Sequence, residues 1–161
     1  MREASLNDIN KFLACKRVAL VGLSRNPRHL SRALFREFAA QGYEMFPVNP
    51  QATEIEGRQC FTRLAEVPPP VQGALLMTGT AEATQQALDD CKRAGVGCIW
   101  IYKAFQDVEE HERTVQCCRT QGAAVIEGYC PFMFLPHPEL VHRLHRFFVK
   151  ITGAFPQRSA T

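Results

Sequence analysis

The sequence predicts an α/β protein, a single Rossmann-type domain with a five-stranded, mainly parallel sheet and helices on both faces. Five short apolar segments alternate along the chain with longer segments of helical periodicity. The apolar segments are almost continuously hydrophobic, which is typical of parallel strands covered on both faces. At 161 residues, the chain is long enough to bury the core of one such domain.

The predicted strands end at residues that favour turns. Gly22 ends the first strand, and Asn49-Pro50 stops the second. Residues 51–71 are expected to be mostly loop, with a half-turn at 62–65 and a break at three consecutive prolines. The five predicted strands are residues 17–22, 43–48, 73–77, 98–102 and 123–126.

The predicted helices carry recognisable ends. Ser5 is a candidate N-cap with Asp8 at the capping-box spacing, and Asp107 is a candidate N-cap further on. Gly42 and Gly95 follow two of the helices, as C-terminal glycines do. The predicted helices are residues 5–14, 28–41, 81–94, 107–120 and 139–151. The last is expected to be a C-terminal addition to a domain of residues 1–152, and 153–161 a loose tail.

The bulk properties narrow the class of protein. The net charge of +3 is too mild to indicate a nucleic-acid partner. No apolar run has the length of a membrane span and no signal peptide is evident, so we expect a cytoplasmic protein without a membrane partner. The seven cysteines include no C-x-x-C pair, and most are expected to be reduced and to pack as small hydrophobic side chains.

Sheets of this class bind ligands at the carboxyl ends of their strands, near the point where strand order reverses. The segments that follow the predicted strands are polar, basic and poor in acids, with Glu127 the nearest carboxylate. These segments are Ser24-Arg25-Asn26-Pro27, Asn49-Pro50-Gln51, Thr78-Gly79-Thr80, Lys103-Ala104-Phe105 and Gly128-Tyr129-Cys130-Pro131.

The segment V-A-L-V-G-L-S-R-N-P (18–27) predicts a phosphate site, because unpaired backbone N–H groups and a helix dipole would face the ligand. It is neither G-x-G-x-x-G nor a P-loop. An NAD site also requires an acid at the end of the second strand, where this chain has Asn49, and the nearest arginine for NADP is Arg58. An NAD(P)-binding oxidoreductase or another nucleotide-using enzyme therefore stays as the alternative function.

Four arginines surround the start of the second predicted helix. Arg25 and Arg28 fall in the turn and the first helical positions, where a cation opposes the helix dipole unless an anion binds, so both are predicted to contact phosphate. Arg32 and Arg36 continue from Arg28 at a spacing of four along one face of the helix. For these two, a solvated basic face is favoured over phosphate contact.

The chain resembles the small stand-alone CoA-binding domain proteins, which are similar to the CoA-binding domain of the succinyl-CoA synthetase alpha subunit. The resemblance spans nearly the whole chain and depends on an ordered combination of segments. These are V-A-L-V-G-L-S-R-N-P, G-Y-E-M-F-P-V-N-P (42–50), E-I-E-G-R-Q-C-F (54–61), I-W-I-Y (99–102), Y-C-P-F-M-F-L-P (129–136) and H-R-L-H-R-F (142–147).

The resemblance implies that CoA lies across the carboxyl edge of the sheet. It places the phosphates at Gly22, Ser24, Arg25 and Asn26, the adenosine end at Val48, Asn49 and Pro50, and the pantetheine arm along Thr78, Ile101, Tyr102 and Lys103. Tyr102-Lys103-Ala104 replaces a turn that often contains Gln-Gly in the family, and the synthetase's phosphorylated histidine has no counterpart here. The resemblance therefore implies non-catalytic binding of CoA or an acyl-CoA, as a sensor or accessory subunit, with a protein partner or homo-oligomer allowed.

The remaining candidates are a cysteine and a group of histidines. Cys130 is predicted at the ligand edge, where a packed structural role is favoured over a mixed disulfide with the CoA thiol. His137, His142 and His145 lack the spacing of a metal site, so no metal is predicted. No Ser-His-Asp or paired-carboxylate arrangement can be assembled from the sequence, and no catalytic residue is predicted.

Overall fold

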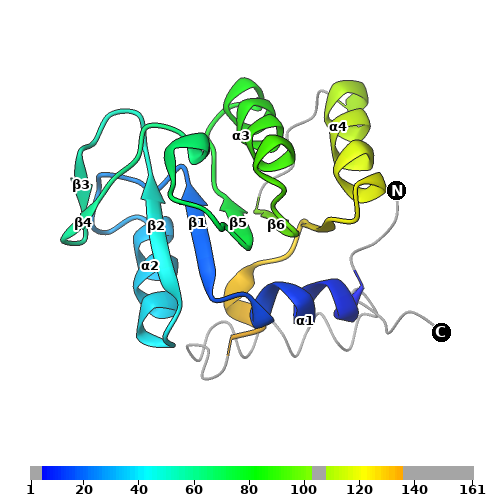
Figure 1. Ribbon diagram of the computed structural model, residues 1–161. Helices are drawn as coiled ribbons and strands as arrows, with labels where there is room; N and C mark the ends of the chain where they lie inside the picture. The colour runs from blue at the N-terminus through cyan, green and yellow to red at the C-terminus, as the bar shows by residue number, and fades with distance from the viewer. Residues whose placement is uncertain (1–4, 103–107, 136–161) are drawn as a thin grey trace.

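The computed structural model describes residues 5–102 and 108–135, which fold around one parallel sheet (Figure 1). The strand order is β2-β1-β5-β6-β7, and every pairing within this sheet is parallel. The strands are β1 (Arg17–Val21), β2 (Glu44–Val48), β5 (Gly73–Leu76), β6 (Cys98–Ile101) and β7 (Ala124–Glu127). The predicted fold class and all five strands are therefore confirmed, with bounds that differ by a residue or two.

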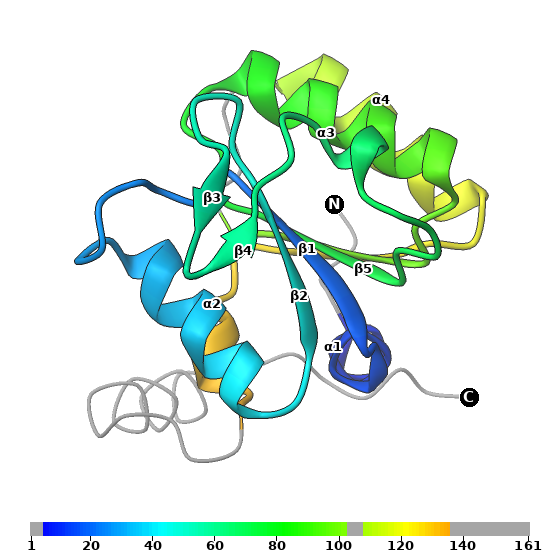
Figure 2. The same cartoon turned by 60° about the vertical axis from the view of Figure 1, so that its left-hand side comes forward.

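Helices cover both faces of the sheet. Figures 1 and 2 show α1 and α2 on one face and α3 and α4 on the other. Their bounds are α1 (Leu6–Ala14), α2 (Leu30–Ala40), α3 (Ala81–Ala94) and α4 (Val108–Thr120), and a short 3₁₀ turn, η2 (Pro131–Met133), follows β7. Asp107, His137, His142, His145, the predicted helix 139–151 and the tail 153–161 lie outside the described residues.

Two helix ends form as their sequences predict. Ser5 caps α1 by accepting a hydrogen bond from the backbone N–H of Asp8 (3.2 Å), and the Asp8 carboxylate accepts one from the N–H of Ser5 (3.3 Å). Gly95 closes α3 in the left-handed conformation, with φ of 66°. The predicted bounds of α3 match the structure at both ends.

Helix α2 begins at Leu30, and the prediction that it begins at Arg28 is wrong. His29 is the N-cap and accepts the N–H of Ser31 through Nδ1 (3.2 Å). In the loop before it, the Ser24 hydroxyl accepts the N–H of Asn26 (3.1 Å), and the Asn26 side chain accepts the N–H of Arg28 (3.0 Å). These short polar side chains compete with the helix for backbone donors, so Arg28 lies in the loop.

The predicted loop 51–71 contains a small hairpin of β3 (Glu54–Ile55) and β4 (Arg58–Gln59), then η1 (Leu64–Glu66). Its turn residues Glu56 and Gly57 have φ of 53° and 68°. Positive φ at both central positions is the mark of a type I′ turn. Strands of two residues have no periodicity to detect, which explains why the hairpin was not predicted. In Figures 1 and 2 it lies at the β2 side of the sheet.

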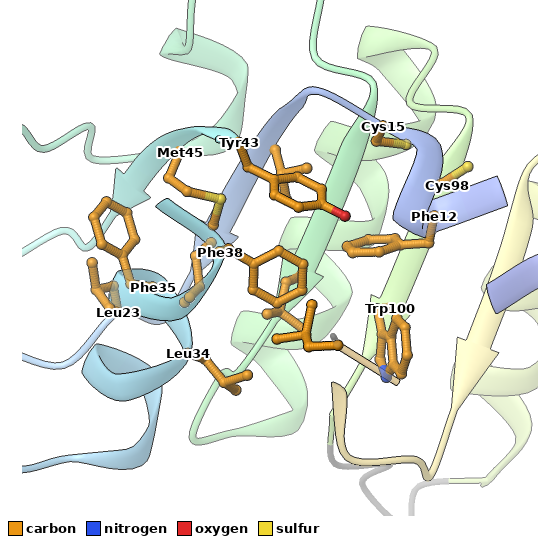
Figure 3. Close-up of a cluster of buried hydrophobic side chains, with 14 of the residues drawn as sticks. Phe12, Cys15, Leu23, Leu34, Phe35, Phe38, Tyr43, Met45, Cys98 and Trp100 are labelled. Carbon is orange, nitrogen blue, oxygen red and sulfur yellow. The ribbon is translucent and has the colours of Figure 1, made fainter. Parts of the chain in front are cut away.

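The strand side chains alternate between two cores. Under α1 and α2 lie Val18, Leu20, Leu75, Trp100 and Ile126, and under α3 and α4 lie Ala19, Ala74, Leu76, Ile99, Ile101 and Val125. Figure 3 shows the first core, where Phe12 packs edge-on against Trp100, with ring centroids 5.2 Å apart. All seven cysteines are thiols outside any disulfide, and five of them are buried, as expected for core side chains. No helix among the described residues is long and apolar enough to cross a membrane.

Candidate ligand-binding site

The fold brings the predicted ligand-binding segments to one edge of the sheet. Strand β1 has β2 on one side and β5 on the other, so the loops after β1 and β5 separate at the point where strand order reverses. The residues at this edge are Gly22, Ser24, Arg25, Asn26 and Arg28 after β1, Asn49 and Pro50 after β2, Thr78 after β5, Tyr102 after β6, and Cys130 after β7. Lys103 lies outside the described residues.

Gly22 stands where three of these segments meet. Its φ is +86°, and a Cβ atom there would lie 2.5 Å from the carbonyl oxygen of Met77, directly before Thr78. Its N–H donates to the carbonyl of Val48 at the end of β2 (3.0 Å). Only glycine fits both this backbone conformation and this close approach. Gly22 thus fixes the spacing of the turns at the switch point.

The loop from Gly22 to His29 is held by its own hydrogen bonds. Ser24 donates its N–H to the hydroxyl of Ser31 (3.0 Å), and Leu23 donates to the Val48 carbonyl (3.3 Å). With the Ser24 and Asn26 bonds already described, most backbone donors of the loop have partners in the protein. The expectation of a row of unpaired N–H groups is therefore wrong. Among the described residues, the N–H of Arg25 has no partner.

Ser31 supports the candidate site, and the sequence did not predict this role. It is fully buried, and its hydroxyl supports the loop by accepting the Ser24 N–H. The available signal was a polar residue on the apolar stripe of α2, at the helical spacing shared by Leu34, Phe35 and Phe38. A buried hydroxyl at such a position requires a hydrogen-bond partner, and here the partner is the ligand-side loop.

Asn49 ties the loops after β1 and β2 together. Its amide nitrogen donates to the carbonyl of Leu23 (2.8 Å), while its amide oxygen accepts the N–H of Gln51 (2.7 Å). The position needs both a donor and an acceptor, which an ionised Asp does not offer. Asn49 stands where an NAD-binding domain has an acid, and its two hydrogen bonds explain why this position is an amide.

Replacing Asn49 with Asp is expected to destabilise the protein by about 1–3 kcal/mol, because the Leu23 carbonyl loses its donor and faces a carboxylate. Urea unfolding followed by Trp100 fluorescence measures the change. Gln51→Glu is the matched control, since it adds the same charge to an exposed neighbour and should cost less than about 0.5 kcal/mol. Equal stability of the two variants would contradict the role of the Asn49 amide.

A groove of about 720 Å³ opens beside this edge. It is lined by Arg25, Arg32, Thr62 and residues 50–56, and its volume is in the range of small-molecule sites. Arg25 is exposed and forms no ion pair with any described residue. Arg25 therefore lines the groove as a cation with no counter-ion in the part of the chain that the structure describes.

The two arginines further along α2 are paired, and the expectation of a solvated basic face is wrong for Arg32. The side chain of Arg32 is only 11% exposed. Its Nε donates to the Glu56 carboxylate (2.7 Å), and its Nη1 donates to the carbonyls of Ser24 and Arg25 (both 3.2 Å). Arg36 binds the same Glu56 oxygen through Nε (2.8 Å). Hydrogen bonding from Arg36, then from Arg32, lowers the pKa of Glu56 despite some burial, so the carboxylate is ionised.

The other predicted site residues differ in how much of their side chain a ligand could contact. Val48 and Ile101 are buried in the second core, so their side chains support the edge from below. Thr84 is buried and donates its hydroxyl hydrogen to the Thr80 carbonyl (2.9 Å), so the hydroxyl of Thr78 donates to Thr84. This leaves the lone pairs of the Thr78 hydroxyl for a ligand.

The far end of the edge holds Tyr102 and Cys130. Burial raises the pKa of both side chains, and the Cys130 thiol adds to the effect on Tyr102. A thiol with a raised pKa is a weak nucleophile at neutral pH, which favours the packed role of Cys130.

Glu127 is turned away from the groove and toward α4. It accepts hydrogen bonds from His111 (2.7 Å) and Arg119 (3.2 Å). Burial alone would raise the pKa of Glu127, but these two partners outweigh it and lower the pKa. Within the described ranges, no three His, Cys, Asp or Glu side chains converge as metal ligands would.

The parallel sheet, the braced loop at its switch point and the groove beside it are the features of a domain of Rossmann type. A family model described as a CoA binding domain matches residues 16–136, and the chain belongs to that family. The expected resemblance is thereby confirmed.

Two curated relatives differ in size. The chain is 35% identical over 131 residues to the uncharacterized protein YneT of Bacillus subtilis, covering 81% of this chain and 93% of YneT. It is 24% identical over 139 residues to the alpha subunit of ADP-forming acetate–CoA ligase II of Pyrococcus furiosus. That match covers 82% of this chain but only 30% of the ligase subunit.

A solved structure agrees on the fold. A hypothetical protein from Pyrococcus horikoshii OT3 superposes with a TM-score of 0.69 at 20% identity, over 81% of this chain and 92% of that one.

Proposed function

We propose that this chain binds coenzyme A or an acyl-CoA at the carboxyl edge of its sheet, without catalysing a reaction itself, as a sensor or an accessory subunit. The observation that carries the proposal is the position of Arg25. Its exposed guanidinium lines the groove and has no counter-ion among the described residues. A cation at a nucleotide-binding edge favours an anionic ligand, and CoA carries a pyrophosphate and a 3′-phosphate.

Each part of the edge has a proposed role. The pyrophosphate is bound by the side chain and backbone N–H of Arg25 and by the exposed side chain of Arg28. The hydrogen bonds of Ser24 and Asn26 hold the loop that carries these groups. The adenosine lies in the groove next to Asn49 and Pro50. The pantetheine arm passes the Thr78 hydroxyl toward Tyr102 and Cys130. The loop is already hydrogen-bonded, so binding costs little ordering of the backbone.

The ligase relative supports binding more than catalysis. The chain corresponds to less than a third of the acetate–CoA ligase alpha subunit, since it covers 30% of its length. We propose that the two share the part that holds CoA, and that any ligation step needs residues of another chain. The amide of Asn49, committed to Leu23 and Gln51, argues against the alternative NAD(P) enzyme, because it takes the place of a ribose-binding carboxylate.

Replacing Arg25 with alanine is expected to weaken CoA binding about tenfold, the loss of one charge-assisted contact at an exposed site, without changing thermal stability in the absence of ligand. Isothermal titration calorimetry measures the dissociation constant. Lys92→Ala is the control, because it removes an exposed cation at the end of α3, at the opposite edge of the sheet. Unchanged affinity in the Arg25 variant would remove this residue from the site.

The ligand itself is tested by thermal shift with CoA, acetyl-CoA, 3′-dephospho-CoA and NAD. The proposal expects a rise in melting temperature with CoA or acetyl-CoA, a smaller rise with 3′-dephospho-CoA and none with NAD. No shift with any CoA form at saturating concentration would overturn it. A shift with NAD alone would instead support the oxidoreductase alternative.

A further inference from the structure

The groove contains one unusual arrangement, an acid that holds two arginines. Glu56 lies at the tip of the β3–β4 hairpin and is itself a lining residue of the groove, as is Arg32. A single carboxylate oxygen accepts from Nε of Arg32 (2.7 Å) and from Nε of Arg36 (2.8 Å), with Nη2 of Arg36 also at 2.7 Å. The other oxygen of Glu56 has no partner among the described residues.

The backbone of Glu56 indicates that the carboxylate is held there against a local preference. Its φ of 53° makes it the only described non-glycine residue with positive φ. Asn, Asp and Gly occupy this first turn position of a type I′ hairpin more readily than Glu does. The turn alone therefore does not explain why this residue is a glutamate. The ion pairs of the Glu56 carboxylate with Arg32 and Arg36 of α2 do explain it.

The two arginines have the geometry of a phosphate site in which a carboxylate takes the place of the phosphate. Arg32 keeps its Nη2 without a partner among the described residues, and Arg36 is 49% exposed. In Rossmann-type folds the adenosine ribose lies by the end of the second strand, and an arginine nearby accommodates an extra ribose phosphate. Pro50, which follows β2 closely, lines the same groove as Arg32 and Glu56.

We propose that Glu56 is a specificity-determining residue that competes with the ribose 3′-phosphate of CoA for Arg32 and Arg36. This inference rests on the proposed function, and it explains what limits the affinity of the proposed site for CoA. In the free protein, the Glu56 carboxylate accepts from both guanidinium groups and offsets one of their two positive charges. A bound 3′-phosphate must share or displace that carboxylate, so the protein binds CoA more weakly than its arginines would allow. The ligand then exchanges readily, as a sensor requires.

The test compares two variants of the same hairpin. Glu56→Asn removes the carboxylate and places at the turn a residue that favours the left-handed conformation, so the hairpin is retained. Glu54→Gln removes the other carboxylate of the hairpin that lines the groove, which forms no ion pair with a described residue. Both variants change the net charge equally. A difference between them therefore reports the pairing with Arg32 and Arg36.

Glu56→Asn is expected to lower the dissociation constant of CoA about five- to tenfold and that of 3′-dephospho-CoA less than about twofold. Glu54→Gln removes the same charge from the groove without touching the two arginines, so it should change the two dissociation constants by a similar factor. The gain should shrink as salt is raised from low to physiological concentration, because freed surface charges are screened. Calorimetric titration of the two ligands with the wild type and both variants gives every value. Glu56→Gly serves as a second variant should the asparagine protein fold poorly.

Three results would overturn the inference while leaving the proposed function intact. They are an equal gain for both ligands, no change for CoA, and weaker CoA binding in the Glu56 variants. The last would mean that Glu56 only braces the loop that Arg32 supports. Failure of the wild type to bind CoA at all would overturn the proposed function, and this inference with it.

Discussion

Replacing Gly22 with alanine is expected to destabilise the protein by about 3 kcal/mol or more. Two costs combine at this position. A left-handed backbone is unfavourable for alanine by about 1–2 kcal/mol. In addition, the new methyl group would lie 2.5 Å from the Met77 carbonyl oxygen and 2.7 Å from its carbon, which are backbone atoms that no rotamer change can move away. Chemical unfolding with urea, followed by circular dichroism, measures the loss.

Gly42 provides a matched control for this prediction. Its φ of +88° is nearly the same as that of Gly22, but a Cβ atom there would meet nothing within 4 Å. Gly42→Ala therefore isolates the conformational cost, and is expected to lose about 1–2 kcal/mol. The difference between the two variants measures the contact between the turns after β1 and β5. If the two variants lose the same stability, the close approach of those turns has no energetic role.

The Gly22 variant also tests how the site is built. Moving Met77 away from the methyl group would displace Thr78, the next residue, and the first turn position after β1 at the same time. We therefore expect the Gly22 variant to lose CoA affinity while the Gly42 variant, beyond the end of α2, keeps it. Gly22 then acts in binding through the spacing of two loops.

The parts of the fold that the sequence predicts well are those whose signal is local. Helix α3 is bounded by Thr80, whose hydroxyl accepts the N–H of Ala83 (3.2 Å), and by Gly95 in the left-handed conformation. The strands are apolar runs that end at Gly22 and Asn49-Pro50. Such signals are contained in a few consecutive residues, so no knowledge of the tertiary structure is needed to use them.

The parts that could not be predicted depend on contacts between distant residues. Arg32 fits an amphipathic helix equally well as a solvated residue, and its burial depends on Glu56, which is 24 positions away. Asn49 stands where an acid would indicate NAD, but its reason to be an amide is the Leu23 carbonyl on another strand's loop. The candidate residues gather at the carboxyl edge, as expected, because topology determines which loops meet there. The partner of each side chain within it is a tertiary property.

Replacing Trp100 with alanine is expected to cost about 3–5 kcal/mol, because its ring is fully buried and its loss leaves a cavity in the core. The side chain packs against Phe12 and Phe134, with ring centroids 5.2 Å and 5.7 Å away. Figure 3 shows the contact with Phe12. Trp100 is the only tryptophan of the chain, so unfolding of this variant is followed by circular dichroism. A Phe12→Ala variant and the double variant complete a cycle, in which the ring pair should contribute a coupling of about 0.5–1.5 kcal/mol.

Trp100→Phe separates packing from the hydrogen bond that joins the core to the ligand edge. The indole Nε1 donates to the carbonyl of Tyr129 (2.8 Å), the residue directly before Cys130. Phenylalanine keeps most of the apolar contact but loses this donor, so it should destabilise the protein less than alanine does, by about 1–2 kcal/mol. Hydrogen exchange should rise in residues 128–133 more than in β1, because the lost bond anchors that segment in particular. If hydrogen exchange instead rises uniformly across the sheet, Trp100 stabilises the protein only by filling the core, and its hydrogen bond does not specifically anchor the Tyr129–Cys130 segment.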